Sequence, residues 1–146
     1  MYTKKFTELL EEYNTYRTQK LDPDQFEALL YTFPSVLVAH ADGRIDDHEK
    51  DYLRHIPDDL ATGFALNGID DAPLLNENYF EEIEYLVQDI NKWHDKFLAA
   101  LKDQLQGSQN EKNAIFQLMW RTADSSEDIS ENERKRIAAI SVKLGL

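Results

Sequence analysis

Apolar residues recur three and four positions apart along most of the chain, with polar residues between them. This spacing gathers the apolar side chains on one face of a helix, so it predicts amphipathic helices. The longest such segment spans residues 77–106 and predicts a long central helix. No segment alternates between apolar and polar residues as a strand does. The pattern therefore predicts an all-α helical bundle of about seven or eight helices.

Proline, glycine and capping residues predict where these helices begin and end. The first helix is expected over residues 3–20, and Asp22 with Pro23 begins the second. Pro34 lacks a backbone N–H, so it predicts a kink or a restart within that second helix. The other expected boundaries are a break at Pro57, a loop over residues 69–76, a helix that begins after Ser108 and a last helix over residues 131–144.

Two acidic stretches, one in each half of the chain, follow the same pattern. In each, an apolar segment ends in Ala-Asp, a polar turn follows, and an Ile stands four positions before a Glu. The second copy lacks the Gly of the first, and its turn is two residues longer. A motif that recurs within a chain indicates two related halves, here residues 1–68 and 77–146. The stretches are Ala39-His40-Ala41-Asp42-Gly43-Arg44-Ile45-Asp46-Asp47-His48-Glu49 and Thr122-Ala123-Asp124-Ser125-Ser126-Glu127-Asp128-Ile129-Ser130-Glu131-Asn132-Glu133.

Each acidic stretch predicts a corner between two helices, with carboxylates at the bend. Asp46 and Glu49 are spaced as a capping box, in which a side chain at each position accepts a hydrogen bond from the backbone N–H of the other. Ser130 and Glu133 have the same spacing, and Gly43 suits a positive φ after a helix end. Ser108-x-x-Glu111 predicts a third box.

The two stretches resemble the TerB-like (tellurite resistance protein B) family, over roughly residues 26–56 and 112–146. Further residues that carry the resemblance are Leu53, Ile56, Ile137 and the ending Leu144-Gly145-Leu146. The resemblance implies a single, internally duplicated, all-helical domain over residues 1–146 and a role in stress or tellurite resistance. It also implies a metal site whose ligands, carried over by position, are Asp42, Glu49, Asp124 and Glu133.

The density of carboxylates at the two corners is itself an argument for a cation. A hard divalent ion with oxygen ligands relieves the repulsion among neighbouring carboxylates. The candidate ion is Ca²⁺, Mg²⁺, Mn²⁺ or Zn²⁺, and the candidate ligands are Asp42, Asp46, Glu49, Asp124, Asp128 and Glu133. The alternative is that Asp46, Glu49 and Glu133 only cap helices. Asp42 and Asp124 follow helix ends, where the helix dipole disfavours an acid, so they are the stronger functional candidates.

Two other metal motifs fit the sequence less well. Polar residues at alternate positions from Asp124 onward match an EF-hand loop, but Ile129 stands in place of its glycine and Lys135 in place of its closing Glu. His48, Asp51 and His55 share one helix face that could hold Zn²⁺, yet no fourth ligand is evident, and a solvated polar face is the commoner outcome. His94 lies on the apolar seam and is expected to be a hydrogen-bonded core or interface histidine.

The amino-acid composition restricts the kinds of partner that the protein is expected to bind. The chain has 16 basic and 28 acidic residues, a formal charge of −12, which excludes nucleic acid and favours cations and basic protein surfaces. There is no cysteine, which is compatible with a reducing cytoplasm, and we expect a cytoplasmic protein. No apolar run is long enough to span a membrane, and the N-terminal residues do not form a signal region.

The sequence shows no phosphate-binding loop and no nucleophile elbow, so an enzyme is not expected. The first functional hypothesis is a cation-binding module that relays stress through protein partners. The alternative is a metal-free interaction scaffold with an exposed apolar groove along residues 77–106. A weaker third is a hydrolase that uses the carboxylates on a metal. Trp93, Phe97, Phe116 and Trp120 are predicted to be core, and the runs 81–84 and 134–136 are predicted to be solvated helix faces.

Overall fold

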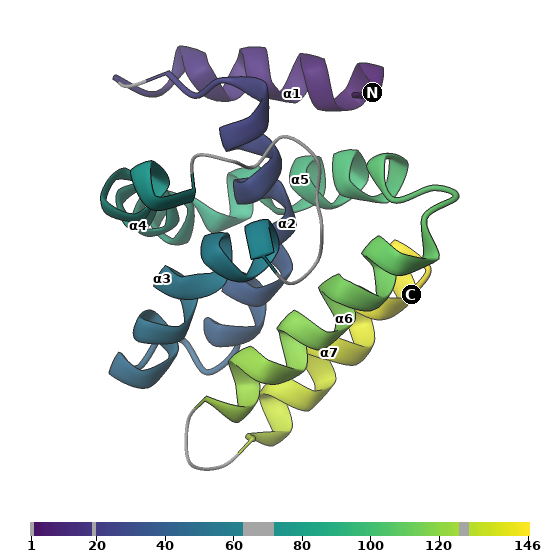
Figure 1. Ribbon diagram of the computed structural model, residues 1–146. Coiled ribbons are helices and arrows are strands. Elements are labelled where there is room, and N and C mark those ends of the chain that lie inside the picture. Colours follow the sequence, from purple (N-terminus) through teal and green to yellow (C-terminus); the bar gives the residue numbers. More distant parts are fainter. Residues whose placement is uncertain (1, 19, 63–71, 126–128) are drawn as a thin grey trace.

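The computed structural model describes residues 2–18, 20–62, 72–125 and 129–146, and for residues 55, 57–62 and 72–79 it describes the backbone only. The described residues form seven helices and no strand, which confirms the all-α prediction. None of these helices is long and apolar enough to cross a membrane. The helices are α1 (Lys4–Thr15), α2 (Pro23–Ala39), α3 (Asp47–Thr62), α4 (Ala72–Gln88), α5 (Ile90–Gln104), α6 (Gln109–Asp124) and α7 (Glu131–Leu144) (Figure 1).

Helix α2 lies at the centre of the molecule (Figure 1). Every residue from Phe26 to Ala39 is buried, and α2 contacts each of the other six helices. A helix that is enclosed on all sides needs no polar face, and this one is largely apolar throughout. The segment that organises the packing is therefore α2.

Helix α2 begins where the sequence predicts and does not restart at its proline. Asp22 accepts a hydrogen bond from the N–H of Gln25 (2.8 Å), Gln25 accepts one from the N–H of Asp22 (3.0 Å), and Pro23 follows the cap. Pro34 lies inside the helix, which continues to Ala39. A proline in mid-helix costs about 3 kcal/mol or more. We attribute the continuity to the burial of the surrounding residues against six neighbouring helices.

The prediction of one long helix over residues 77–106 is wrong. The segment divides at Asp89, whose φ of −114° and ψ of 33° lie outside the helical region. Helix α4 packs mainly on α3, and α5 packs mainly on α1. The apolar spacing is still used on both sides of the break, because Leu86 and Trp93 are fully buried. What the spacing did not reveal is the break, since Asp89 makes no side-chain capping bond that a motif would signal.

Other boundaries shift by smaller amounts. Helix α1 ends at Thr15, and α3 continues past Pro57 to Thr62. Residues 72–76 of the predicted loop belong to α4, while residues 69–71 lie outside the described ones. Helix α7 spans the predicted residues. The single domain and the two related halves stay predictions.

One core joins all the helices. Buried apolar side chains from α1 to α7 form a single cluster. At the α1 side of this cluster the ring of Tyr13 packs against Phe26, Trp93 and Phe97, with centroid distances of 5.5, 5.3 and 5.8 Å. Trp93 and Phe97 are therefore core residues, as predicted.

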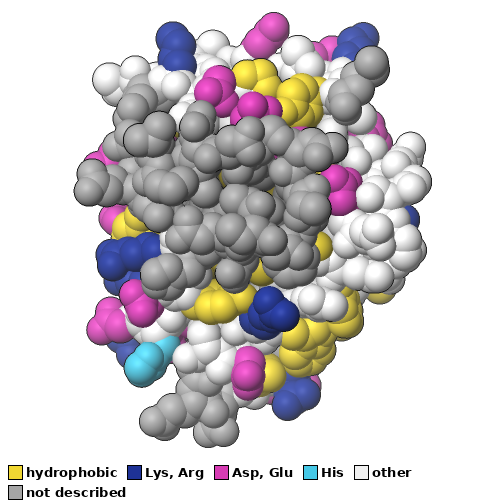
Figure 2. Space-filling model, in the orientation of Figure 1, with side chains coloured by type: hydrophobic (Ala, Val, Ile, Leu, Met, Phe, Trp, Pro, Cys, Tyr) yellow, Lys and Arg dark blue, Asp and Glu magenta, His cyan; other side chains and the backbone are white. Residues whose placement is uncertain are grey.

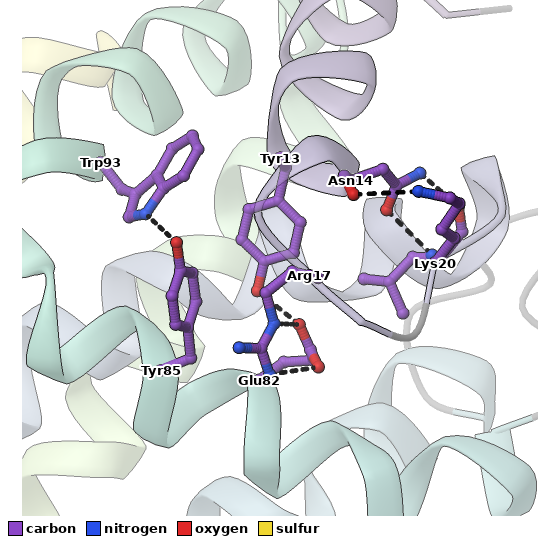
Figure 3. A network of polar contacts seen from close by, with 8 residues as sticks. Tyr13, Asn14, Arg17, Lys20, Glu82, Tyr85 and Trp93 are labelled. Carbon is purple, nitrogen blue, oxygen red and sulfur yellow. Dashed lines mark hydrogen bonds and ion pairs between the residues drawn. The ribbon is translucent and has the colours of Figure 1, made fainter.

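A buried polar network ties the end of α1 to α4 (Figure 3). Arg17 donates two hydrogen bonds to the carboxylate of Glu82 (2.8 and 2.9 Å), and the hydroxyl of Tyr13 donates a third (2.6 Å). Trp93 donates to the hydroxyl of Tyr85 beside them (3.3 Å). Glu82 is only 3% exposed, so the prediction of a solvated face over residues 81–84 is wrong at this position. The buried carboxylate is tolerated because three donors satisfy it.

Candidate functional site

The two acidic corners meet at one end of the molecule. The turn between α2 and α3 lies at the lower end in Figure 1, as do the end of α6 and the beginning of α7. Asp42 accepts hydrogen bonds from the hydroxyl of Ser130 (2.8 and 3.1 Å to its two oxygens) and from the amide of Asn132 (3.1 Å). Stretches that are 88 residues apart in the sequence are thus in direct contact.

The first corner is shaped by a glycine and a complete capping box. Gly43 has a φ of +92°, in the left-handed region that favours glycine. The carboxylate of Asp46 accepts from the N–H of Glu49 (2.8 Å), and the carboxyl of Glu49 accepts from the N–H of Asp46 (3.1 Å). Both predictions for this corner are confirmed.

The second corner has the same box without the glycine. Ser130 Oγ accepts from the N–H of Glu133 (3.1 Å), and Glu133 accepts from the N–H of Ser130 (2.9 Å). The third predicted box forms only in half. Ser108 accepts weakly from the N–H of Glu111 (3.4 Å), but the carboxylate of Glu111 accepts from the hydroxyl of Tyr31 (3.1 Å) instead.

The two capping glutamates form a buried pair. Glu49 is 4% exposed and Glu133 is 2% exposed, and the two carboxyl groups lie close enough for Glu133 to help raise the pKa of Glu49. Burial is the largest cause that raises the pKa of Glu49 to about 8, and the contact with Glu133 adds to it, while the N–H of Asp46 acts in the opposite sense. Oε2 of Glu133 is buried and has no hydrogen-bond partner among the described residues. Such a pair is stable only when a proton or a cation lies between the two groups.

The structure brings together some of the six predicted ligands. Glu49 and Glu133 face one another, and Asp46 caps α3 beside them. Asp42 is exposed and engaged by the second corner, whereas Asp124 is exposed at the end of α6. Asp128 lies outside the described residues. Within the described ranges no three His, Asp or Glu side chains are grouped as a metal site, so the full ligand set stays a prediction.

Two side chains that join the corners, those of Ser130 and Asn132, were not predicted to contact the first corner. Ser130 was expected only as a cap, and Asn132 was not assigned any function. The available signal was the run of polar residues at alternate positions after Asp124, which resembled an ion-binding loop. In the structure two members of this run bind the carboxylate of Asp42 rather than an ion.

The histidines do not add to this site. His48 is exposed at the start of α3, and the side chain of His55 lies outside the described residues. His94 is half-buried on α5, and its Nδ1 lies 2.8 Å from a carboxylate oxygen of Asp95. The expected hydrogen bond of His94 is therefore confirmed, whereas a position in the core is not.

The surface is mixed in character. On the face that Figure 2 shows, acidic side chains are scattered among basic ones, and hydrophobic side chains are exposed over α6. Phe116 of α6 is 41% exposed and packs against the half-buried Trp120, with a centroid distance of 6.4 Å. The core prediction is therefore wrong for Phe116, whereas Trp120 is partly buried and packs against the core.

The helices and their paired corners define a small, acidic, all-helical protein with two capped turns in contact. The family model for the tellurite resistance protein TerB matches residues 32–146. The chain therefore belongs to the TerB family, which confirms the resemblance. No curated protein and no solved structure matches the chain. The family match includes both corners and leaves α1 and the beginning of α2 outside.

Proposed function

We propose that this TerB-family chain is a non-enzymatic, cytoplasmic binding module that holds a divalent cation between its two acidic corners. In this proposal it serves a stress or tellurite-resistance system through protein partners. The observation that carries the proposal is the buried pair of Glu49 and Glu133. The exposed carboxylate of Asp42 belongs to the first corner and accepts a hydrogen bond from Ser130 of the second.

The pair favours a cation for an electrostatic reason. Two ionised carboxylates in a buried position repel each other, and a shared proton removes only one of the two charges. A divalent cation neutralises both. The donors at this end of the molecule are oxygens, which suit Ca²⁺, Mg²⁺ and Mn²⁺ better than Zn²⁺. Oε2 of Glu133 is buried and has no hydrogen-bond partner among the described residues, so it is the atom best suited to bind such an ion.

The cavity next to the first corner supports a non-enzymatic role. It has a volume of about 350 Å³, and among the described residues Glu84 is the one carboxylate that lines it. None of the corner carboxylates that the structure describes lines it. A hydrolase of the third hypothesis would need these groups to face its substrate.

Thermal unfolding with added cations tests the proposal. The protein is stripped with EDTA and melted with Ca²⁺, Mg²⁺, Mn²⁺ or Zn²⁺. A specifically bound ion should stabilise the wild type by about 2.7 kcal/mol at a hundredfold excess over Kd. Glu133→Gln should abolish this gain, because the amide removes one of the two charges and can donate a hydrogen bond to the carboxylate of Glu49. Asp42→Asn should weaken it, and Glu131→Gln, an exposed change of equal charge, should leave it intact.

The opposite result is also informative. An equal, small gain with every cation, retained in Glu133→Gln, would mean general screening of the −12 charge and would overturn the cation site. The metal-free scaffold would then be the better description. The exposed Phe116 beside Trp120 supports that second candidate, since exposed aromatic residues are enriched at protein interfaces.

A further inference from the structure

We propose that the cavity between the first corner and α4 is a binding site for a small carboxylate with an apolar tail. The cavity lies between the turn that follows α2 and the residues at the end of α4, where Phe80 and Val87 line it. This site is separate from the buried pair of Glu49 and Glu133, and it does not depend on a bound cation.

One wall of the cavity is apolar. Ile45 from the turn and Phe80, Ile83 and Val87 from α4 line it. Ile83 is 1% exposed and belongs to the core, while the other three are half-buried and reach the solvent through the cavity. An apolar chain placed here would remove this surface from water at roughly 25 cal/mol per Å².

The mouth of the cavity is basic. Arg44 and Lys50 line it and are exposed, and neither forms an ion pair with a described carboxylate. His40 adds a half-buried imidazole on the same side. A mouth with two basic side chains that no described carboxylate pairs is complementary to an anion. The carboxylate of Glu84 repels an anion in the cavity, so replacing Glu84 by a neutral residue should strengthen binding.

The size of the cavity restricts its occupant. A volume of about 350 Å³ is near the lower end of ligand sites, which span roughly 300–1,000 Å³. A cavity of this size suits a single short chain better than an amphipathic helix. The basic mouth and the apolar wall then require a charged head and an apolar tail in one small molecule.

Titration with octanoate in EDTA tests this site. The amide resonances of Gly43 and Ile45 in ¹H–¹⁵N spectra report on the cavity wall. Octanoate should shift them saturably, whereas acetate, which lacks the tail, and 1-octanol, which lacks the charge, should each bind at least tenfold more weakly.

Variants assign the binding to the cavity. Arg44→Ala/Lys50→Ala should weaken octanoate at least tenfold, and Glu84→Gln should tighten it two- to threefold. Val87→Phe should abolish binding by filling the cavity without a change in charge. Lys102→Ala/Lys135→Ala, two exposed residues outside the cavity, removes the same charge and should have no effect.

Several outcomes would overturn the proposal. Equal binding of 1-octanol would indicate an apolar cavity with no role for charge, and equal binding of acetate would indicate surface ion pairing alone. Tighter binding of a peptide with an apolar C-terminal residue and a free carboxylate would assign the site to a protein chain end. Retention of octanoate binding in both the double variant and Val87→Phe would place it elsewhere. Glu133→Gln should bind octanoate normally, which separates this site from the cation site.

Discussion

At the scale of single residues, the fold changes the acid–base chemistry of Glu49. Its capping role follows from local spacing, and sequence analysis predicted that role correctly. Its burial against Glu133 depends on the packing of α3 and α7 against α2 and α6, and no local pattern encodes that packing. The sequence therefore favoured Asp42 and Asp124 as functional residues, whereas the structure brings the two capping glutamates together.

The raised pKa of Glu49 predicts how stability depends on pH. In the unfolded chain Glu49 releases its proton near 4.5, but in the folded protein it retains the proton up to about 8. Stability should therefore fall as pH rises from about 4.5 to 8, by up to about 1.4 kcal/mol per pH unit for this group. Glu27, whose pKa burial raises to about 7, contributes with the same sign.

Urea denaturation at pH 5, 6.5 and 8 checks this prediction. The stability of Glu49→Gln should decline less with rising pH than that of the wild type, because Glu49, one of the two glutamates with a raised pKa, no longer titrates. Glu131→Gln, at an exposed position in the first turn of α7, should keep the wild-type decline. An unchanged decline in Glu49→Gln would contradict the assignment.

At the scale of helices, boundaries with a capping signal were predictable and boundaries without one were not. Asp22 with Pro23, Asp46 and Ser130 each begin a helix at the predicted place. The break at Asp89 and the continuity of α2 through Pro34 have no local signal. Both are set by which helices pack together, and that information is not local.

The two serine caps offer a matched comparison between helices. Ser130 Oγ caps α7 and also donates to Asp42, whereas Ser108 Oγ caps α6 with one long hydrogen bond of 3.4 Å. Loss of an N-cap costs about 0.5–2 kcal/mol. Ser130→Ala should lie at the upper end of this range and Ser108→Ala at the lower end. Chemical denaturation measures both, and equal losses would mean that the contact with Asp42 does not contribute to stability.

At the scale of the whole molecule, α1 is held against the rest of the protein by aromatic packing and by one buried ion pair (Figure 3). Sequence analysis predicted a first amphipathic helix with an apolar stripe and gave Glu82 a solvated position. The stripe was predictable from its spacing. The pairing of Arg17 with Glu82 joins residues 65 positions apart and was not.

The ion pair predicts a large effect from a single substitution. Arg17→Ala leaves the carboxylate of Glu82, 3% exposed, without its charged partner. Breaking a buried pair in this way should cost about 3 kcal/mol. Arg17→Lys should be intermediate, because an ammonium cannot reproduce the two parallel hydrogen bonds. Denaturant midpoints measure the losses.

An exposed ion pair on the same helix supplies the control. Lys4 lies 3.7 Å from Glu8, and the two side chains are 90% and 63% exposed. Lys4→Ala should leave the denaturant midpoint nearly unchanged, since exposed pairs contribute little. If Arg17→Ala had an effect as small as that of Lys4→Ala, the buried ion pair would not contribute to holding α1 in place.

The contact between the corners also sets an order in time. Ser130 follows Asp42 by 88 residues, so a ribosome needs roughly 4 to 18 s to reach it at about 5–20 residues per second. The first turn can complete its own capping box within that interval, because both of its members are already present. Its aspartate, however, has no serine to meet until α7 begins to emerge, and until then Glu49 stays in water with an ordinary acidity. The contact between the two corners therefore starts from residues that are synthesised early and forms only when α7 is synthesised.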